Sequence, residues 1–199
     1  MKLCFFGDSI GKGIVYDKER GRYVPTENSF VRLVGEEEKI DIENFSRFGC
    51  TVTRGEQIVE RNVPEIKSSD YVVLEFGGND SDLDWKAVCD DPDREMYPAK
   101  VSIPDFKSAL RHMIDRARQA DMRPMLVTPL PVMAERYLNW ISRGLDKQRI
   151  LRYLGNAEYI YRWQERYAYA ALKTANEANC PIFDLRGLFL DQRDFRDMM

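Results

Sequence analysis

The sequence lacks several residue patterns that common functional sites require. Its 199 residues include one histidine, His112, which excludes a metal site built from several histidines. The four cysteines occur without a Cys-x-x-Cys pair, so neither a zinc ribbon nor a thioredoxin-type redox motif is expected. Free cysteines fit a reducing cytoplasm, which is the location that we expect. No pattern calls for a metal or an organic cofactor, and we expect none.

The sequence also lacks an excess of charge and a long apolar run. Lysine and arginine number 30 and aspartate and glutamate 33, a net charge of −3, so binding to nucleic acid through bulk attraction to phosphate is not expected. No window of about 18 apolar residues exists, and we therefore expect no membrane span. The apolar run within residues 1–6 is too short for a signal peptide. Nothing in the sequence indicates an oligomeric state.

What the sequence does contain is an alternation of short apolar runs with longer amphipathic stretches. The continuous apolar runs are typical of strands buried on both faces. The expected strands are residues 3–6, 40–45, 71–76, 124–128 and 181–184. The expected helices are residues 29–38, 55–66, 104–120 and 159–178, with Pro64 interrupting the second and an extra helix around 145–154. This alternation predicts one domain over residues 1–199, an α/β protein with three α/β/α layers and a flavodoxin-like five-stranded parallel sheet.

Two connections are too long to be plain loops, residues 81–101 and 129–158. Both leave the carboxyl ends of strands, where ligands bind in such sheets. We interpret the acidic run 80–95 as a solvated loop rather than a cation site. Aromatic residues in these connections could line a substrate entrance, although packing is the more common role for such residues. They are Trp85, Tyr137, Trp140 and Tyr153.

Small polar residues follow the first three strands, and the carboxyl ends of parallel strands meet at one edge of a sheet. Each group alone is typical of an ordinary loop. Together they offer specific chemistry, because a serine on a tight turn, Ser9, can act as a nucleophile. The Ser9 N–H, the Gly49 N–H and the Asn79 side chain could then stabilise an oxyanion.

The run Phe6-Gly7-Asp8-Ser9-Ile10 resembles the first sequence block of the SGNH (GDSL-type) hydrolase family. Asn44-x-Ser46-x-x-Gly49-x-Thr51 resembles the second block, and Gly77-x-Asn79-Asp80 the third. The resemblance implies the SGNH hydrolase fold and an esterase or lipase that cleaves small-molecule acyl or acetyl esters, or thioesters, through an acyl-serine intermediate. It assigns Ser9 as the nucleophile, completes the oxyanion hole with Gly49 and Asn79, and makes Asp8 a support for the turn.

The last block of the family, Asp-x-x-His after the fifth strand, has no match in residues 1–199. His112 lies about 240° around its helix from Phe106, whereas the apolar face spans about −20° to 80°, so we expect His112 at the surface. We therefore expect the missing block to follow residue 199, because the chain ends with no terminal helix to cover the sheet edge. Asp197 would be the catalytic aspartate if residue 200 were histidine, and is a surface residue otherwise. The 199-residue fragment is then expected to be nearly inactive.

Two further interpretations stay open. The protein could be a catalytically inactive module that binds carbohydrate or acyl groups and lacks the Asp-x-x-His block. It could also be a flavodoxin-like nucleotide binder, which we disfavour because the Ser9, Gly49 and Asn79 set would then be accidental.

Overall fold

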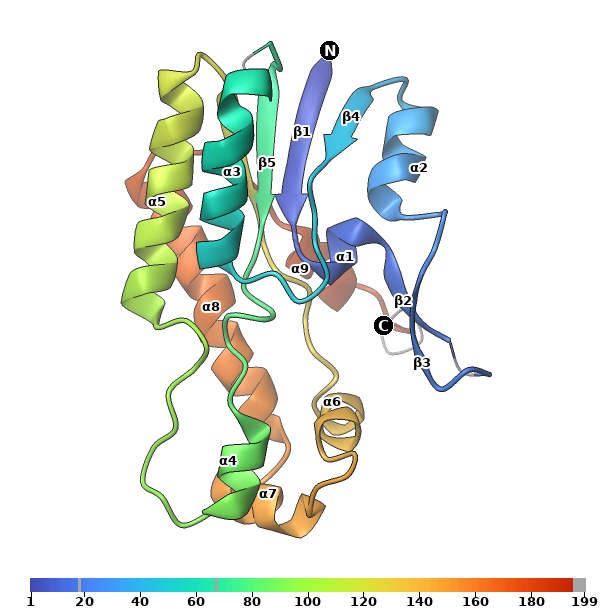
Figure 1. The fold of residues 1–199 in the computed structure, drawn as a ribbon, viewed down its shortest axis with the longest axis vertical. Coiled ribbons are helices and arrows are strands. Elements are labelled where there is room, and N and C mark those ends of the chain that lie inside the picture. The colour runs from blue at the N-terminus through green and yellow to red at the C-terminus, as the bar shows by residue number, and fades with distance from the viewer. Residues whose placement is uncertain (18, 67, 195–199) are drawn as a thin grey trace.

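The centre of the protein is a parallel sheet of five strands in the order β4-β1-β5-β6-β7 (Figure 1). The structure, a computed structural model, describes residues 1–17, 19–66 and 68–194. The strands are β1 (Lys2–Gly7), β4 (Asp41–Asn44), β5 (Tyr71–Glu75), β6 (Arg123–Val127) and β7 (Ile182–Phe183). The predicted α/β sheet is therefore confirmed, and all its pairs are parallel.

The strand order brings three loops together at the carboxyl edge of the sheet. Strand β1 lies between β4 and β5, and Gly7 at its end pairs in register with Glu75. On the other side Phe5 pairs with Asn44, the last residue of β4. The chain segments that follow β1, β4 and β5 consequently emerge side by side, as the sequence predicts for its three polar groups.

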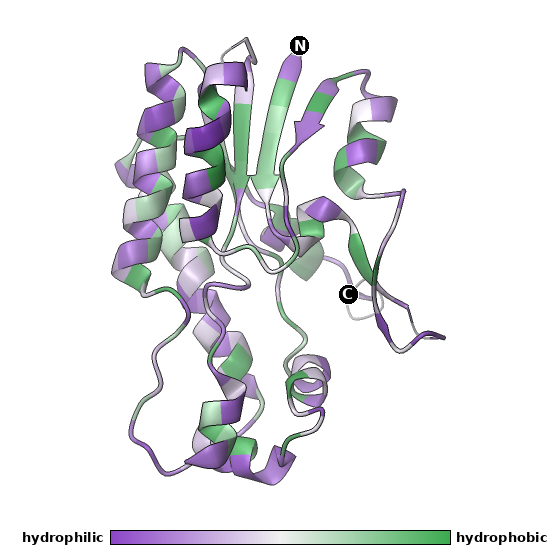
Figure 2. Ribbon diagram, viewed as in Figure 1, coloured by the Kyte–Doolittle hydropathy of each residue, from purple (hydrophilic) through white to green (hydrophobic). Residues whose placement is uncertain are grey.

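Helices cover both faces of the sheet because residues in the strands point alternately to either side. Cys4 and Phe6 of β1 pack in the main core with α3 (Val52–Ile66), α5 (Ile103–Gln119) and α8 (Glu158–Glu177). Phe5 packs on the opposite face with Val31 of α2 (Phe30–Glu37) and Leu185 of α9 (Leu185–Leu190). Figure 2 shows β1 and β5 apolar along most of their length, whereas α3 and α5 alternate hydrophilic and hydrophobic residues.

One expectation about helices is wrong, and one short helix was not predicted. Helix α3 runs through Pro64 to Ile66, because Val59, Val63 and Ile66 are buried in the core and Pro64 lies on the exposed side. A proline there removes one N–H bond near the helix end, where water can reach the freed carbonyl group. A helix also follows the last strand: α9 begins after Asp184, whose side chain caps it by accepting the Gly187 N–H at 2.9 Å.

The two long connections fold into a lobe beyond the carboxyl edge of the sheet (Figure 1). We call residues 81–101 and 130–160 the lobe. It contains α4 (Trp85–Asp90), α6 (Ala134–Ile141), α7 (Lys147–Leu154) and the start of α8, around a small core of its own. Helix α7 confirms the extra helix expected around residues 145–154. In the described part of the chain, no helix is both long and apolar enough to cross a membrane.

Residues 9–17 and 22–25 form elements that the sequence does not predict. Helix α1 (Ser9–Lys12) is one turn long, and a hairpin of β2 (Ile14–Asp17) and β3 (Arg22–Pro25) follows it. The hairpin stands beside the carboxyl edge of the sheet, apart from the five main strands (Figure 1).

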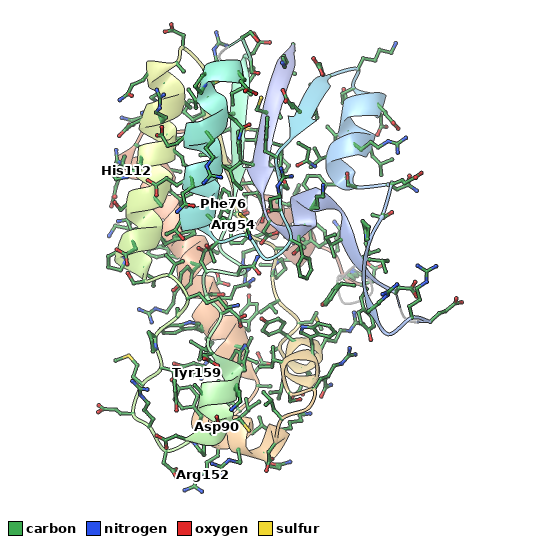
Figure 3. The ribbon with its side chains drawn as sticks, viewed as in Figure 1. Arg54, Phe76, Asp90, His112, Arg152 and Tyr159 are labelled. Carbon is green, nitrogen blue, oxygen red and sulfur yellow. The ribbon has the colours of Figure 1, made fainter. Side chains whose placement is uncertain are left out.

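Close packing of α3 on the sheet gives a test of the fold. A Cβ atom on Gly55 would lie 2.3 Å from Cζ of Phe76, whose ring is fully buried and is labelled in Figure 3. We expect Gly55→Ala to lower the free energy of unfolding by about 1–3 kcal/mol, measured by chemical denaturation. Helix propensity alone favours alanine by about 1 kcal/mol, so an unchanged or higher stability would contradict this packing. Gln57→Ala, on the exposed side of α3, is the control and should stay within about 0.5 kcal/mol.

Candidate functional site

The turn after β1 places Ser9 at the start of α1. Asp8 caps this helix, and its Oδ1 accepts the Ile10 N–H at 2.9 Å. Gly13, at φ +75°, ends the helix after a single turn. Ser9 is half-buried at this sharp corner, so its hydroxyl group sits at the carboxyl edge of the sheet rather than in the core.

The loop after β4 is held against this turn. The Arg47 N–H donates to the carbonyl oxygen of Gly7 at 3.1 Å, and the Asn44 side-chain amide donates to the carbonyl oxygen of Gly11 at 2.7 Å. Gly49, at φ +65°, lies at the exposed tip of this loop. A Cβ atom there would meet no atom within 4 Å, so the left-handed backbone is what favours glycine.

Asn79, in the loop after β5, connects the other two loops. Its Nδ2 donates to Oδ2 of Asp8 at 3.0 Å and to the carbonyl oxygen of Cys50 at 3.3 Å. Asp8 precedes Ser9 and Cys50 follows Gly49. The structure therefore brings the three sequence-predicted residues Ser9, Gly49 and Asn79 into one site.

Two backbone donors at this site are free. Within the described part of the chain, neither the Ser9 N–H nor the Gly49 N–H donates to a backbone or side-chain acceptor. Both hydrogens of the Asn79 amide are engaged, so a bound oxyanion would have to replace the longer bond to Cys50. Such a set of fixed N–H donors can stabilise negative charge on a ligand oxygen.

Three carboxyl groups are buried directly behind these donors. Asp8, Glu75 and Asp80 are 3%, 2% and 0% exposed. Burial raises the pKa of Asp8 to about 6 and that of Asp80 to about 7. Burial also raises the pKa of Glu75 well above its ordinary value, and the neighbouring Asp8 charge raises it further. The described residues contain no cluster of His, Cys, Asp and Glu arranged to hold a metal ion.

Sequence reasoning overlooked Glu75. The signal was present, because Glu75 is the single charged residue in the apolar run 71–76. A carboxyl group in a strand that is buried on both faces needs a specific partner, and Asp8 on the neighbouring strand end is that partner.

His112 is at the surface, as its helical position predicts. Its side chain is 66% exposed, and Nδ1 lies 2.9 Å from Oε1 of Glu56 on α3. Figure 3 shows His112 on the outer side of α5. Asp184, directly after β7, caps α9 and accepts a hydrogen bond from the Thr128 hydroxyl group at 3.0 Å. Asp197 lies outside the described residues.

The start of the acidic run is not solvated, contrary to expectation. Asp80 is buried and accepts the Val52 N–H at 2.7 Å, at the first residue of α3. Asp82 joins the site loop to the lobe. Its Oδ1 accepts hydrogen bonds from the Trp85 indole N–H at 2.5 Å and from the Tyr137 hydroxyl group at 2.8 Å. Burial raises the pKa of Tyr137 well above its ordinary value, so the hydroxyl keeps the proton that it donates.

Trp85, Tyr137 and Tyr153 have packing roles. Trp85 and Tyr137 contact Asp82, and the Tyr153 hydroxyl accepts the Tyr97 N–H at 3.1 Å inside the lobe. The labels for Asp90, Arg152 and Tyr159 in Figure 3 mark this part of the molecule.

Trp140 belongs instead to an aromatic wall on the Gly49 side of the site. The centroid of its ring lies 4.6 Å from that of Tyr23 and 5.9 Å from that of Tyr16. The ring centroids of Tyr23 and Phe48 are 6.3 Å apart. Arg143 holds the wall together, stacking over Trp140 at 4.4 Å and donating to the Tyr16 hydroxyl at 2.6 Å. Phe48 is 58% exposed and directly precedes Gly49.

Comparisons with known proteins agree with this fold. The family model for the GDSL-like Lipase/Acylhydrolase family matches residues 5–199. No curated protein sequence matches significantly. Among solved structures, a lipase/acylhydrolase from Enterococcus faecalis superposes with a TM-score of 0.65 at 20% identity, over 100% of this chain and 83% of that one.

Two acetylxylan esterases also share the fold. One, described as AlAXEase, has a TM-score of 0.61 at 19% identity, over 100% of this chain and 84% of its own. The other, from Geobacillus stearothermophilus, has a TM-score of 0.60 at 20% identity, over 99% and 78%. The structures of this second enzyme include two catalytic mutants, one with a histidine and one with a serine replaced by alanine.

The raised pKa of Asp80 makes stability depend on pH. Its ordinary pKa is 3.8, so between about pH 4 and pH 7 the folded chain holds a proton that the unfolded chain releases. The free energy of unfolding therefore falls as pH rises through this window. Asp80→Asn keeps an oxygen acceptor for the Val52 N–H and removes this proton.

We expect Asp80→Asn to flatten the decline and to be more stable than the wild type at pH 8, in denaturant titrations at several pH values. Asp115→Asn, at an exposed position of α5, should leave the pH dependence unchanged. Parallel curves for Asp80→Asn and the wild type would contradict the assignment.

Proposed function

The chain belongs to the GDSL-like lipase/acylhydrolase family, whose members are esterases and lipases, and we propose that it hydrolyses carboxylic esters through an acyl intermediate on Ser9. One observation carries the proposal. The Asn79 amide donates both to the residue before Ser9 and to the residue after Gly49, which gathers a nucleophile and three oxyanion donors in one place.

In the proposed reaction the Ser9 hydroxyl oxygen attacks the ester carbonyl carbon and gives its proton to a general base. The carbonyl electron pair moves onto the carbonyl oxygen. This oxyanion accepts hydrogen bonds from the Ser9 N–H, the Gly49 N–H and the Asn79 amide. The tetrahedral intermediate collapses, the alcohol leaves with the proton, and water then hydrolyses the acyl-serine by the same steps.

The general base is the missing part of this chain. The Asp-x-x-His block that the family resemblance implies is absent from residues 1–199, and His112 is paired with Glu56 at the surface of α5. The members of a catalytic triad act as a unit, so loss of the base lowers the rate by orders of magnitude.

The substrate that we propose is a small acyl or acetyl ester. Acetylxylan esterases with the same fold support an acetyl group as the acyl part. The aromatic wall beside Gly49 supports the binding of the alcohol part. The half-exposed rings of Tyr23 and Phe48 offer apolar surface to the alcohol part of such a substrate.

A soluble base should restore part of the missing chemistry. We expect imidazole to accelerate cleavage of 4-nitrophenyl acetate by residues 1–199, in proportion to imidazole concentration and beyond the reaction of imidazole alone. The increment should vanish in Ser9→Ala, because Ser9 supplies the attacking oxygen. Release of 4-nitrophenol at pH 7.5 measures both rates.

Three results would contradict this expectation. Fast Ser9-dependent turnover without imidazole would mean that the chain holds its own base. An increment that survives in Ser9→Ala would remove Ser9 from the reaction, and no increment at all would favour an inactive binding module.

The same assay tests the oxyanion donors. We expect Asn79→Ala to lower the imidazole-dependent rate by about 10²–10³-fold, the usual loss for one donor. Asn176→Ala, at an exposed position of α8, is the matched control and should keep the full rate. A rate for Asn79→Ala within twofold of the wild type would exclude Asn79 as a donor.

A further inference from the structure

Glu75 is a buried carboxyl group for which the proposed reaction has no direct use. It is the last residue of β5, in register with Gly7 of β1, and is 2% exposed. A Cβ atom on Gly7 would lie 3.0 Å from Oε2 of Glu75, so the glycine makes room for this carboxyl group.

The polar neighbour of Glu75 is Asp8. Asp8 follows Gly7, the register partner of Glu75, so a hydrogen bond between the carboxyl groups of Asp8 and Glu75 is within reach. Oε2 of Glu75 has no hydrogen-bond partner in the described part of the chain. The two carboxyl groups can form that bond only if one of them carries a proton.

The surroundings decide which of the two groups holds the proton. The charged groups that face Glu75 are Asp8 and Asp80, and Glu75 forms no ion pair with a lysine, arginine or histidine of the described chain. An ionised Glu75 would leave negative charge on an orphaned, buried oxygen, which is costly. Asp8 accepts the Ile10 N–H at 2.9 Å and the Asn79 amide at 3.0 Å, so the charge is better placed on Asp8.

We propose that Glu75 is the protonated member of this carboxyl pair and that its hydrogen bond fixes the Asp8 carboxylate in the orientation that holds the Asn79 amide. Glu75 is then a positioning residue that acts on the oxyanion site through Asp8 and Asn79. Its influence on the reaction rests on the proposed function, whereas its protonation and its effect on Asn79 do not.

The directions of the pKa shifts agree with this geometry. Burial raises the pKa of Glu75 well above the ordinary value, whereas the pKa of Asp8 is raised only to about 6. Asp8 is therefore the first of the two to ionise, and the pair releases its protons in separate steps, as two interacting carboxyl groups at close range usually do.

The wild-type chain provides the first experiment. With ¹³C-labelled glutamate carboxyl groups, an NMR titration from pH 4 to pH 8 should leave one glutamate signal, absent in Glu75→Gln, at its protonated position up to pH 7. If that signal moves with an ordinary pKa near 4.3, the proposal is wrong.

Variants then test the positioning effect. Glu75→Gln keeps a donor for Asp8, whereas Glu75→Leu keeps the size of the side chain without the donor. Exchange of the Asn79 side-chain amide protons with solvent should remain slow in Glu75→Gln and become at least tenfold faster in Glu75→Leu. Gln57→Leu, at an exposed position of α3, is the control and should leave this exchange unchanged. Equal exchange in folded Glu75→Leu and wild type would overturn the proposal, and if Glu75→Leu does not fold, the titration decides.

The consequence for the reaction is measured separately. The imidazole-dependent, Ser9-dependent rate should fall about tenfold in Glu75→Leu and return to within twofold of the wild type in Glu75→Gln. If Ser9→Ala shows that no such rate exists, the proposed function fails, while the titration and the amide exchange still test Glu75. If the rate exists but Glu75→Leu keeps it in full, the positioning role is refuted.

Discussion

The hydrogen bond from the Asn79 amide to the Asp8 carboxylate is the contact on which the site depends. It spans 71 positions of sequence and only 3.0 Å of space, because β1 and β5 are neighbours in the sheet. The second bond of the same amide, to Cys50, adds the loop after β4. One side chain thus aligns three loops, and the Ser9 and Gly49 N–H groups are left to a ligand.

This arrangement places an acidic cluster where water cannot reach it. Burial disfavours the charged form of a carboxyl group. It therefore raises the pKa values of all three members of the cluster, Asp8, Glu75 and Asp80. In return their carboxyl groups fix the backbone: Asp8 caps α1, and Asp80 binds the first N–H of α3. The Ser9 and Gly49 N–H groups are already free, so only the Asn79 bond to Cys50 has to be given up when charge develops on a substrate.

The sequence predicted the parts of the fold that depend on local pattern. Apolar runs identified the five strands, and the groups around Ser9, Gly49 and Asn79 fell at one sheet edge as expected. What it missed depends on distant partners. Asp82 is only partly exposed, and it accepts a hydrogen bond from Tyr137, 55 positions later. The hairpin packs through Tyr16 and Tyr23 against Trp140, which no local pattern could indicate.

The central claim is that Ser9, Gly49 and Asn79 form one oxyanion site, and binding of phenylboronic acid tests it without requiring a general base. Boron should become tetrahedral on the Ser9 oxygen, and the NMR signals of the Ser9 and Gly49 N–H groups and of the Asn79 side-chain amide should shift together. The account predicts that these three signals shift most and that Ser9→Ala abolishes the change. Shifts centred elsewhere, or unchanged binding by Ser9→Ala, would contradict it.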